Sequence, residues 1–334
     1  MAKTKLVESK KNDNFILDGL IEKYGNIIYD YSDVINVKKE LVSVSPSVDF
    51  CLGGGVQSGD LFLLAGPAKG GKTTTMLQMA SNGNEKYGKK IFFANIEARL
   101  TARSLKGIHN LKEDNFKVIQ SNSDKILTGE EHLSIIENII KTHPNSIVLV
   151  DSLSAICPES ESTDILTGQF RAGSPRLFSA FCKRIRQILT CNNVILCGTL
   201  HMMASMNTGY GRQTMSDGGY KLKYNSDVFL EIRYIEPYEN GTEQIGQKIH
   251  WQCSWASLGP PNRKAIGYIR YNYGLDNIME NIEFGVQLGL IGKAGSWFSL
   301  GDIKCQGQEK LRSALLEAPE SLKSLELEVK NMLV

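Results

Sequence analysis

A glycine-rich run near the start of the sequence has the residue types that bind the phosphates of a nucleotide. Residues 66–73 match the pattern G-x-x-x-x-G-K-[ST] and lie between a strand-like apolar run and a helical stretch. In this pattern the glycines let backbone N–H groups converge on phosphate oxygens, the lysine pairs with the outer phosphates, and the hydroxyl ligates Mg²⁺. A chance glycine-rich turn would not need those flanking elements. The predicted nucleotide-binding residues are Gly66, Pro67, Ala68, Lys69, Gly70, Gly71, Lys72, Thr73 and Thr74.

Two carboxylates follow apolar runs that have the length of buried strands. Asp151 ends the run Ile147–Val150, and Glu97 comes two residues after Ile91–Asn95. The carboxyl ends of parallel strands open into one crevice, so both side chains are predicted to lie beside the phosphates. Asp151 is therefore a candidate Mg²⁺ ligand through water, together with Thr73. Position alone leaves Glu97 open between an ordinary surface carboxylate and the group that orients the attacking water.

Short apolar runs alternate with helical stretches over most of the chain. This alternation predicts an α/β fold with a mostly parallel, doubly wound sheet. The last two apolar runs have no helix between them, which predicts an antiparallel extension at one edge. The expected strands are Leu61–Ala65, Ile91–Asn95, Lys117–Gln120, Ile147–Val150, Val194–Gly198, Val228–Arg233, Ile245–Cys253 and Ala265–Tyr271, and the expected helices are Thr73–Tyr87, Gly129–Thr142 and Leu177–Cys191.

The pattern of apolar and polar residues predicts that the chain is divided into three parts. Residues 1–45 carry an amphipathic helix, Phe15–Tyr24, and a short strand, Asn26–Tyr29, which are too few to bury a core of their own. This arm either frays from its own core or docks on a neighbouring copy. Residues 46–274 hold the alternating pattern, and residues 275–334 form a small C-terminal domain.

Composition excludes several classes of protein. The 38 Lys+Arg and 36 Asp+Glu leave a net charge of +2, so nucleic-acid binding has to come from local patches. No apolar run reaches the roughly 18 residues of a membrane span, and the charged N-terminus is not a secretory signal. The seven Cys contain no C-x-x-C pair and the five His are scattered, so no zinc spacing is present. These features predict a cytoplasmic protein with reduced thiols.

With these residues in place, the sequence resembles the RecA recombinase family over nearly the whole chain. The resemblance rests on GPAKGGKTT, IEARL, VDSLSAICP, GGYKLKYNSDVFLEIR and LGLIGKAGSWFS, in family order and with family-like spacing. The last two segments are far more specific than the phosphate loop. The resemblance implies a RecA-type P-loop ATPase core, an N-terminal helix-strand oligomerisation arm and a small α+β C-terminal domain.

The resemblance also implies roles for individual residues. Lys72 and Glu97 would be catalytic, and Tyr271 would lie against the nucleotide base. His201 would contact the γ-phosphate end and report it to the loop that follows, although a lone His at a strand end is more often a satisfied structural residue. Bacterial members carry Gln at this position. A His is similar to bacteriophage recombinases of the UvsX type and hints at viral origin, hence at the cytoplasm of a host.

Two stretches, 159–173 and 202–217, are predicted to be loops at the carboxyl edge of the sheet. In the resemblance they are the loops that hold single-stranded DNA. Arginines suit phosphates, an apolar or aromatic side chain can insert between bases or stack on them, and glycines allow close backbone approach. Each arginine taken singly could equally be a solvated surface charge. The candidates are Arg171, Arg176, Met206, Tyr210, Arg212, Gly218 and Gly219.

The function that the resemblance implies is ATP-dependent DNA strand exchange. The protein would form a helical filament on single-stranded DNA and pair it with homologous duplex DNA, with single-strand-binding and loader proteins as possible partners. Three alternatives remain open from the residues: a hexameric RecA-fold DNA helicase, a weakly hydrolysing loader or paralogue of a recombinase, and a generic P-loop kinase. The N-terminal arm and the paired loops favour the recombinase.

The sequence departs from the family in three places. Trp255 and Ser257 stand where RecA presents two lysines to the γ-phosphate of a neighbour, and Arg263 and Lys264 are nearby alternative cations. The residues after Glu97 lack the Asp and Tyr that frame adenine, which leaves adenine specificity open. No acidic tail follows the last helical stretch, so no autoinhibitory tail is expected.

Overall fold

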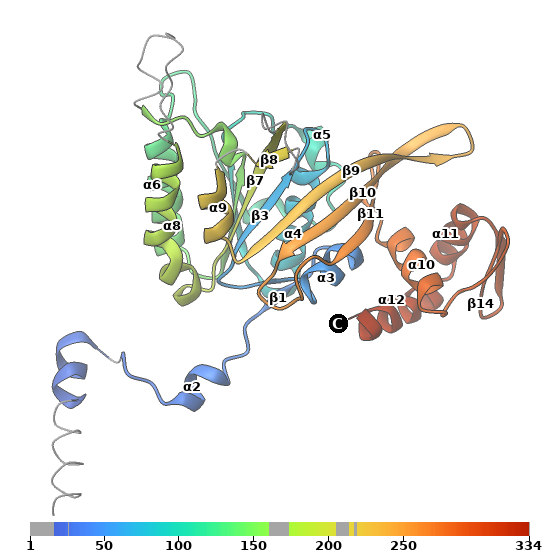
Figure 1. Ribbon diagram of the computed structural model, residues 1–334, viewed down its shortest axis with the longest axis horizontal. Helices are drawn as coiled ribbons and strands as arrows, with labels where there is room; N and C mark the ends of the chain where they lie inside the picture. Colours follow the sequence, from blue (N-terminus) through green and yellow to red (C-terminus); the bar gives the residue numbers. More distant parts are fainter. Residues whose placement is uncertain (1–16, 26, 160–173, 205–213, 217–218, 334) are drawn as a thin grey trace, which may run out of the picture. The chain divides into compact units, whose positions relative to one another are not determined.

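The computed structural model describes residues 17–25, 27–159, 174–204, 214–216 and 219–333 (Figure 1). Contacts between residues divide the chain into two units, with the boundary between Lys39 and Glu40. Each unit is described by itself. Among the described residues, no helix has the length and apolar character needed to cross a bilayer.

The described residues of the first unit include two helical segments. One covers residues 17–24 and ends at Gly25, which adopts a φ of +82°. The other, α2 (Tyr31–Ile35), is not expected from the apolar pattern. The strand predicted over Asn26–Tyr29 is wrong as far as this part is described, because residues 27–30 have no regular secondary structure. An extended segment becomes a strand only when another strand pairs with it.

The second unit is built on one large sheet. Neighbouring strands are parallel from β9 through β5 and antiparallel from β9 through β12, which confirms the predicted parallel sheet with an antiparallel edge. The strand order is β12 (Gly274–Leu275), β11 (Lys264–Arg270), β10 (Glu243–Trp255), β9 (Val228–Asn240), β3 (Leu61–Gly66), β7 (Ile195–Ala204), β6 (Ser146–Asp151), β4 (Lys90–Asn95) and β5 (Phe116–Ile119), with β8 (Thr214–Ser216) paired to β7.

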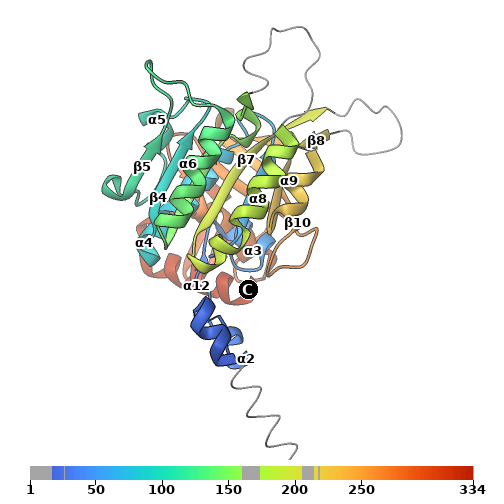
Figure 2. The same cartoon turned by 90° about the vertical axis from the view of Figure 1, so that its left-hand side faces the viewer.

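Both faces of the central strands are buried, as expected for a doubly wound sheet. Side chains alternate along β3, so Phe62 and Leu64 join the apolar cluster on one face while Leu61 and Leu63 join the cluster on the other. Figure 2 shows α6 and α8 side by side in front of β7. The covering helices are α4 (Lys72–Tyr87) for the first cluster, and α6 (Gly129–Thr142) and α8 (Ser174–Cys191) for the second.

The three helices and eight strands predicted for this unit are all present, although β7 and β9 run six and seven residues beyond their predicted ends. The three helices agree with prediction to within three residues, but the loop predicted over 202–217 is wrong at both ends. Residues Met202–Ala204 complete β7 and pair antiparallel with β8. The physical reason is that a hairpin needs only backbone pairing, which a polar, glycine-containing composition does not reveal. The remainder, 205–213 and 217–218, lies outside the described residues.

Smaller elements frame the edges of the large sheet. They are β1 (Leu41–Val42) paired with β2 (Val56–Gln57), α3 (Pro46–Leu52), α5 (Ala102–Leu105), the short 3₁₀ turns η1 (Glu113–Asn115) and η2 (Leu153–Ala155), and α9 (Gly219–Asn225).

The C-terminal region has a small apolar core of its own, built around Ile282, Leu311 and Leu325. Its helices and three-stranded antiparallel sheet agree with the predicted α+β class. The elements are α10 (Asn277–Gln287), β13 (Gly292–Ala294), β14 (Trp297–Leu300), β15 (Ile303–Gln306), α11 (Gln308–Glu317) and α12 (Pro319–Leu333).

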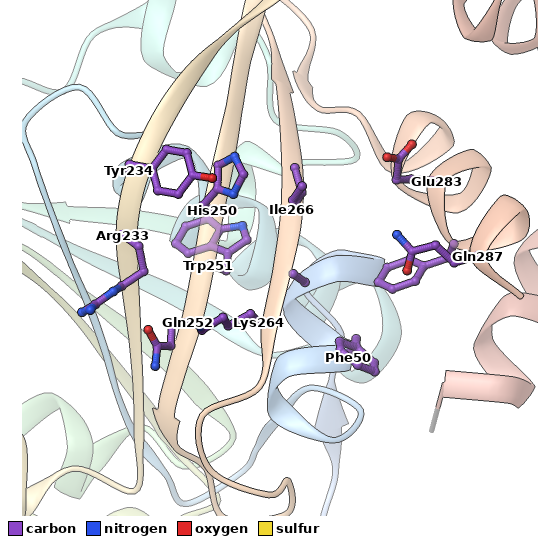
Figure 3. A pocket seen from close by; sticks show the side chains of 12 residues that line it. Phe50, Arg233, Tyr234, His250, Trp251, Gln252, Lys264, Ile266, Glu283 and Gln287 are labelled. Carbon is purple, nitrogen blue, oxygen red and sulfur yellow. The ribbon is translucent and has the colours of Figure 1, made fainter. Parts of the chain in front are cut away.

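A pocket of about 690 Å³ lies where α3 and α10 face the antiparallel edge of the sheet (Figure 3). The Tyr234 and His250 rings are stacked there with 3.7 Å between their centroids. Lys264 lines the same pocket from β11, and Glu283 lines it from α10. This pocket is therefore a feature of the seam between the large sheet and the C-terminal helices.

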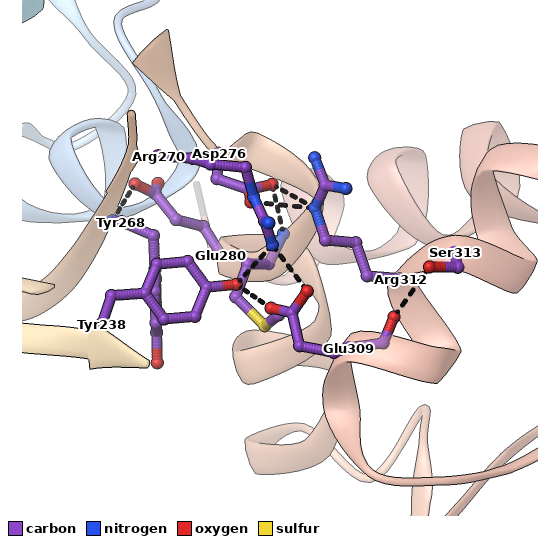
Figure 4. A network of polar contacts seen from close by, with 9 residues as sticks. Tyr238, Tyr268, Arg270, Asp276, Glu280, Glu309, Arg312 and Ser313 are labelled. Atoms are coloured by element: carbon purple, nitrogen blue, oxygen red, sulfur yellow. Dashed lines mark hydrogen bonds and ion pairs between the residues drawn. The ribbon is translucent and has the colours of Figure 1, made fainter. Parts of the chain in front are cut away.

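A network of charges crosses the same seam (Figure 4). The Asp276 carboxylate, which is fully buried, accepts hydrogen bonds from Arg270 Nε at 3.0 Å and from Arg312 Nε at 2.8 Å. Arg270 also donates to Glu309 at 2.6 Å, and Tyr238 donates to Glu309 as well. Because these residues come from β9, β11, α11 and the start of α10, the network fastens the C-terminal helices to the sheet.

Candidate nucleotide-binding site

The phosphate loop joins β3 to α4 and packs tightly against the neighbouring sheet edge. Gly71 is the N-cap of α4 with φ +81°, and a Cβ placed on it would lie 2.1 Å from Cδ1 of Ile269 in β11. Glycine is therefore favoured by the left-handed conformation, and a Cβ would also displace the end of the Ile269 side chain. Lys72 is 6% exposed, and its ammonium donates to the carbonyls of Gly66 at 3.0 Å and Pro67 at 2.8 Å. It lies folded back on the loop that would cradle the phosphates.

Asp151 lies opposite the start of α4, as its position after a strand predicted. Its Oδ2 accepts a hydrogen bond from Thr73 Oγ1 at 2.7 Å, and its Oδ1 accepts one from Thr199 Oγ1 at 2.6 Å. Carboxylate and hydroxyl oxygens are the ligands that Mg²⁺ prefers, so this donor set fits the metal.

Glu97 also lies in the crevice, because the backbone that follows β4 is hydrogen-bonded to the end of β6. The Glu97 N–H donates to the Asp151 carbonyl at 3.2 Å. The carboxylate is 13% exposed and contacts two basic side chains, His201 through Nε2 at 2.9 Å and Arg99 through Nη1 at 2.8 Å. Burial favours the neutral acid, but hydrogen bonds and the charges of His201 and Arg99 outweigh it and lower the pKa of Glu97. The carboxylate is therefore ionised at neutral pH.

His201 is placed beside the phosphate loop by strand register. In the parallel pair of β3 and β7, His201 lies opposite Gly66. Its backbone N–H donates to Ser154 Oγ at 2.9 Å, which holds the strand end while the ring contacts Glu97. The sequence predicted both residues for the crevice, but their mutual hydrogen bond was not predicted.

Tyr271 follows the end of β11 and is 48% exposed. Its hydroxyl accepts a hydrogen bond from Gln244 Nε2 at 2.9 Å. Ile269, two residues earlier, contacts the phosphate loop at Gly71, and residues two apart along a strand share a face. This placement is compatible with a position against a nucleotide base.

The structure describes only two of the candidate DNA-binding residues. Arg176 is exposed near the start of α8, and Gly219 begins α9. The other candidates lie outside the described residues: Arg171, Met206, Tyr210, Arg212 and Gly218.

The side chains at the two positions where lysines were expected form hydrogen bonds within this chain. Trp255 Nε1 donates to the Ser226 carbonyl at 3.1 Å, and Ser257 Oγ donates to Asp60 Oδ2 at 2.9 Å. One of the two alternative cations has a hydrogen bond within its own chain. Arg263 donates to the Phe50 carbonyl at 2.9 Å, and Lys264 lines the pocket of Figure 3.

Arg99 is the residue of the crevice that the sequence does not predict. It is two residues beyond Glu97, and a side chain at that spacing faces its neighbour only if the backbone turns sharply between them. The turn is made by Ala98, whose φ is +53°. No sequence signal predicts a left-handed alanine, so the contact appears only in the structure.

A phosphate loop on β3, an acidic strand end on β6, a carboxylate after β4 and the β7 strand between β3 and β6 together define a RecA-type P-loop ATPase. The antiparallel extension and the α+β C-terminal region complete this class.

Comparison with known proteins gives the same answer. The family model of the RecA N-terminal domain matches residues 21–276, and that of the RecA C-terminal domain matches residues 279–334. Protein RecA of Thermus thermophilus is 30% identical over 298 residues, covering 87% of this chain and 86% of that protein. Protein RecA of Thermus aquaticus is 31% identical over 288 residues, covering 85% and 83%. Protein RecA of Acholeplasma laidlawii is 29% identical over 290 residues, covering 86% of each.

The chain belongs to the RecA family. It is accordingly an ATP-dependent recombinase: it binds ATP and DNA, hydrolyses ATP in a DNA-dependent manner, and assembles into filaments for strand exchange in recombination and repair. The comparisons do not favour the helicase or loader alternatives.

Proposed function

We propose that Lys72, Thr73, Glu97, Asp151 and His201 form the centre that hydrolyses ATP and signals its presence to bound single-stranded DNA. The observation that carries this proposal is the 2.9 Å hydrogen bond between His201 and Glu97. This hydrogen bond links Glu97, the carboxylate that would activate water, to β7, the strand that precedes residues 205–213.

Lys72 is suited to bind the outer phosphates of ATP. Its two acceptors are loop carbonyls rather than carboxylates, so phosphate oxygens can replace them without breaking an ion pair. Burial lowers the pKa of Lys72, while the charges of Asp151 and Glu97 oppose that effect. A triphosphate would add negative charge and hold the ammonium protonated.

Thr73 and Asp151 would hold Mg²⁺, which supplies charge neutralisation between the β- and γ-phosphates when bound. The hydrogen bond from Thr199 holds one oxygen of Asp151 in place and so fixes the orientation of the carboxylate. Tyr271 would stack against the base at the far end of the nucleotide.

Glu97 would orient the attacking water and accept its proton. Its lowered pKa keeps it ionised, and its depth beside Asp151 places it at the carboxyl end of the parallel strands. Efficient proton acceptance by a positioned carboxylate contributes about 10²- to 10⁴-fold to a rate.

His201 would act as the switch. A γ-phosphate competes with Glu97 for the imidazole, and any displacement of His201 moves the adjoining hairpin, since Met202 pairs with Ser216. We assign DNA contacts to the segment that follows η2 and to the segment that leads from β7 to α9. The residues are Arg171, Arg176, Met206, Tyr210, Arg212, Gly218 and Gly219.

The larger organisation follows from the same proposal. Residues 1–45 would be the polymerisation arm, residues 46–274 the ATPase core and residues 275–334 the C-terminal domain. The exposed apolar side chains of the arm, such as Tyr31 at 80% and Val34 at 59%, suit contact with a second copy. His201 favours a UvsX-like, bacteriophage-encoded subtype that acts in the host cytoplasm, with single-strand-binding and loader proteins as partners.

The test is ATP hydrolysis with and without single-stranded DNA, comparing wild type with Glu97→Ala. We expect strong stimulation by DNA in the wild type and its loss in the variant, with ATP still bound. Hydrolysis that ignores DNA would contradict the loop assignment. An active Glu97→Ala variant would contradict the role of the carboxylate.

A further inference from the structure

The turn after β4 is held in a strained conformation by several hydrogen bonds. Ala98 has a φ of +53°, a conformation that costs a residue with a Cβ about 1–2 kcal/mol. Asn95 Oδ1 accepts hydrogen bonds from the N–H groups of Arg99 at 3.1 Å and Leu100 at 3.2 Å. Asn95 Nδ2 is itself fixed by donating to Gln120. Strain maintained by such a network occurs mainly where a side chain must be placed for function.

The side chain that this turn places is Arg99. Its Nη1 lies 2.8 Å from Glu97 Oε2, while His201 occupies the other carboxylate oxygen, Oε1. The Arg99 side chain is 77% exposed, and the contacts of the described residues engage only Nη1. A guanidinium has five N–H donors in a planar fork, so Nε and Nη2 can bind a second anion while Nη1 remains on Glu97.

Phosphoryl transfer needs such a cation. Negative charge accumulates on the equatorial oxygens of the transferred group, and an arginine that neutralises it is worth about 10³- to 10⁵-fold in related enzymes. The positions expected to provide cations from a neighbour carry Trp255 and Ser257, both bonded within their own chain. Of the two nearby cations, Arg263 donates through Nη1 to the Phe50 carbonyl and Lys264 lines the pocket of Figure 3, so neither contacts Glu97 as Arg99 does.

We propose that Arg99 is a catalytic residue that supplies this positive charge in cis. The inference rests on the proposed function of Glu97. The oxygen of water attacks the γ-phosphorus as the bond to the β–γ bridging oxygen breaks, the electron pair of that bond leaves with ADP, and Glu97 accepts the proton of the water. Arg99 spans the carboxylate and the γ-phosphate oxygens during this step, which aligns the base and offsets the developing charge.

The experiment compares Arg99→Ala and Arg99→Lys in the full chain with single-stranded DNA present. The matched control is Arg184→Ala, which removes an arginine that is 67% exposed and also paired with a glutamate, Glu137, but on α8 and α6 away from the phosphate loop. Three quantities are measured: kcat and KM for ATP, binding of a fluorescent ADP, and binding of the same ADP with aluminium fluoride, which mimics the transferred phosphoryl group.

For Arg99→Ala we expect kcat to fall by about 10²- to 10³-fold, the loss found when one transition-state donor is removed. KM and binding of ADP alone should change less than about threefold, while the added affinity from aluminium fluoride disappears. Arg99→Lys should recover part of kcat, and Arg184→Ala should match the wild type.

Two results would overturn the proposal. One is a kcat for Arg99→Ala within about threefold of wild type while Glu97→Ala is inactive, which would leave the proposed function intact and remove Arg99 from it. The other is a fall in kcat with aluminium fluoride binding retained, which would make Arg99 a residue that only positions Glu97. An active Glu97→Ala variant would instead contradict the proposed function itself.

Discussion

Two acidic clusters in this protein are each held by two basic side chains, yet they differ in what surrounds them. In the crevice, Glu97 contacts His201 and Arg99, whose side chains are 34% and 77% exposed. In the seam, Asp276 contacts Arg270 and Arg312, whose side chains are 19% and 9% exposed. The basic side chains of the seam cluster are nearly buried, whereas those of the crevice cluster are accessible to a further anion. The same pairing of a carboxylate with two basic side chains therefore fastens two parts of the fold in the seam, and in the crevice it forms the site for which we propose a catalytic role.

The largest expected effect comes from breaking the seam cluster. Asp276→Asn removes the charge between two arginines and leaves buried Arg312 uncompensated. Breaking a buried ion pair by removing one partner costs about 3–5 kcal/mol. We expect the free energy of unfolding, measured by chemical denaturation, to fall by that amount. Glu97→Gln should change it by less than about 1 kcal/mol, since its basic partners can turn to solvent. Equal losses in the two variants would contradict the contrast between the regions.

A smaller effect is expected from a glycine that belongs to the crevice. Gly71→Ala adds a methyl group at φ +81° and 2.1 Å from Ile269 Cδ1. The left-handed conformation alone costs about 1–2 kcal/mol. We expect KM for ATP to rise by roughly tenfold, because the loop must shift to relieve the backbone strain, whereas the end of the Ile269 side chain can move aside.

The matched control for this change is Gly241→Ala in the turn between β9 and β10. That glycine has φ +65°, and its added methyl group meets nothing within 4 Å. It should lower stability by a similar amount without altering KM. An unchanged KM in Gly71→Ala would show that the loop tolerates the methyl group.

Substitution of His201 tests whether ATP hydrolysis in the crevice is coupled to DNA binding. His201→Ala removes the donor to Glu97 and should reduce the stimulation of hydrolysis by single-stranded DNA about tenfold or more, because a hydrogen bond to a charged group is worth about 1.5–3 kcal/mol. His201→Gln can still donate through its amide and should retain most of the stimulation. Hydrolysis rates with and without DNA give the ratio directly. Full stimulation in His201→Ala would remove the residue from the switch.

The sequence predicted the parts of the crevice that depend on local pattern. The phosphate loop, Asp151 and the position of Glu97 all follow from strand-then-motif arrangements that a chain encodes within a few residues. The pairing of Glu97 with His201 depends on β6 lying between β4 and β7, and strand order is a property of the whole sheet. The seam network had no sequence signal, because Arg270, Asp276 and Arg312 look like ordinary surface charges until burial brings them together.

The arm and the hairpin that follows His201 show a second limit of prediction from sequence. The strand expected over Asn26–Tyr29 has the right residues but no partner strand among the described residues, whereas β8 has an ordinary composition and does find a partner in β7. Strand formation depends on pairing, so propensity alone misjudged both segments in opposite directions.

The smallest expected effect is a difference in pH dependence between the two regions. Glu280 in the seam is fully buried and accepts hydrogen bonds from the N–H groups of Ser47 at 2.8 Å and Tyr268 at 3.1 Å. Burial raises the pKa of Glu280 to about 7, against those hydrogen bonds. The folded state therefore binds more protons than the unfolded state between the ordinary pKa of 4.5 and about 7.

The sign follows from that excess of bound protons. The contribution of Glu280 is fully present at low pH and is lost as pH rises through about 7, so its part of the free energy of unfolding should fall by about 1 kcal/mol between roughly pH 6 and pH 7. Asp49, whose pKa burial also raises to about 7, adds a fall of the same sign that remains in Glu280→Gln. Glu97 has a lowered pKa, so its contribution is present above 4.5 and is lost only as pH falls. The free energy of unfolding, measured by denaturation at the two pH values, should fall with pH in the wild type and in Glu97→Gln. The fall should be smaller in Glu280→Gln. An unchanged slope in Glu280→Gln would mean that the seam carboxylate is already ionised at the lower pH, its backbone donors outweighing its burial.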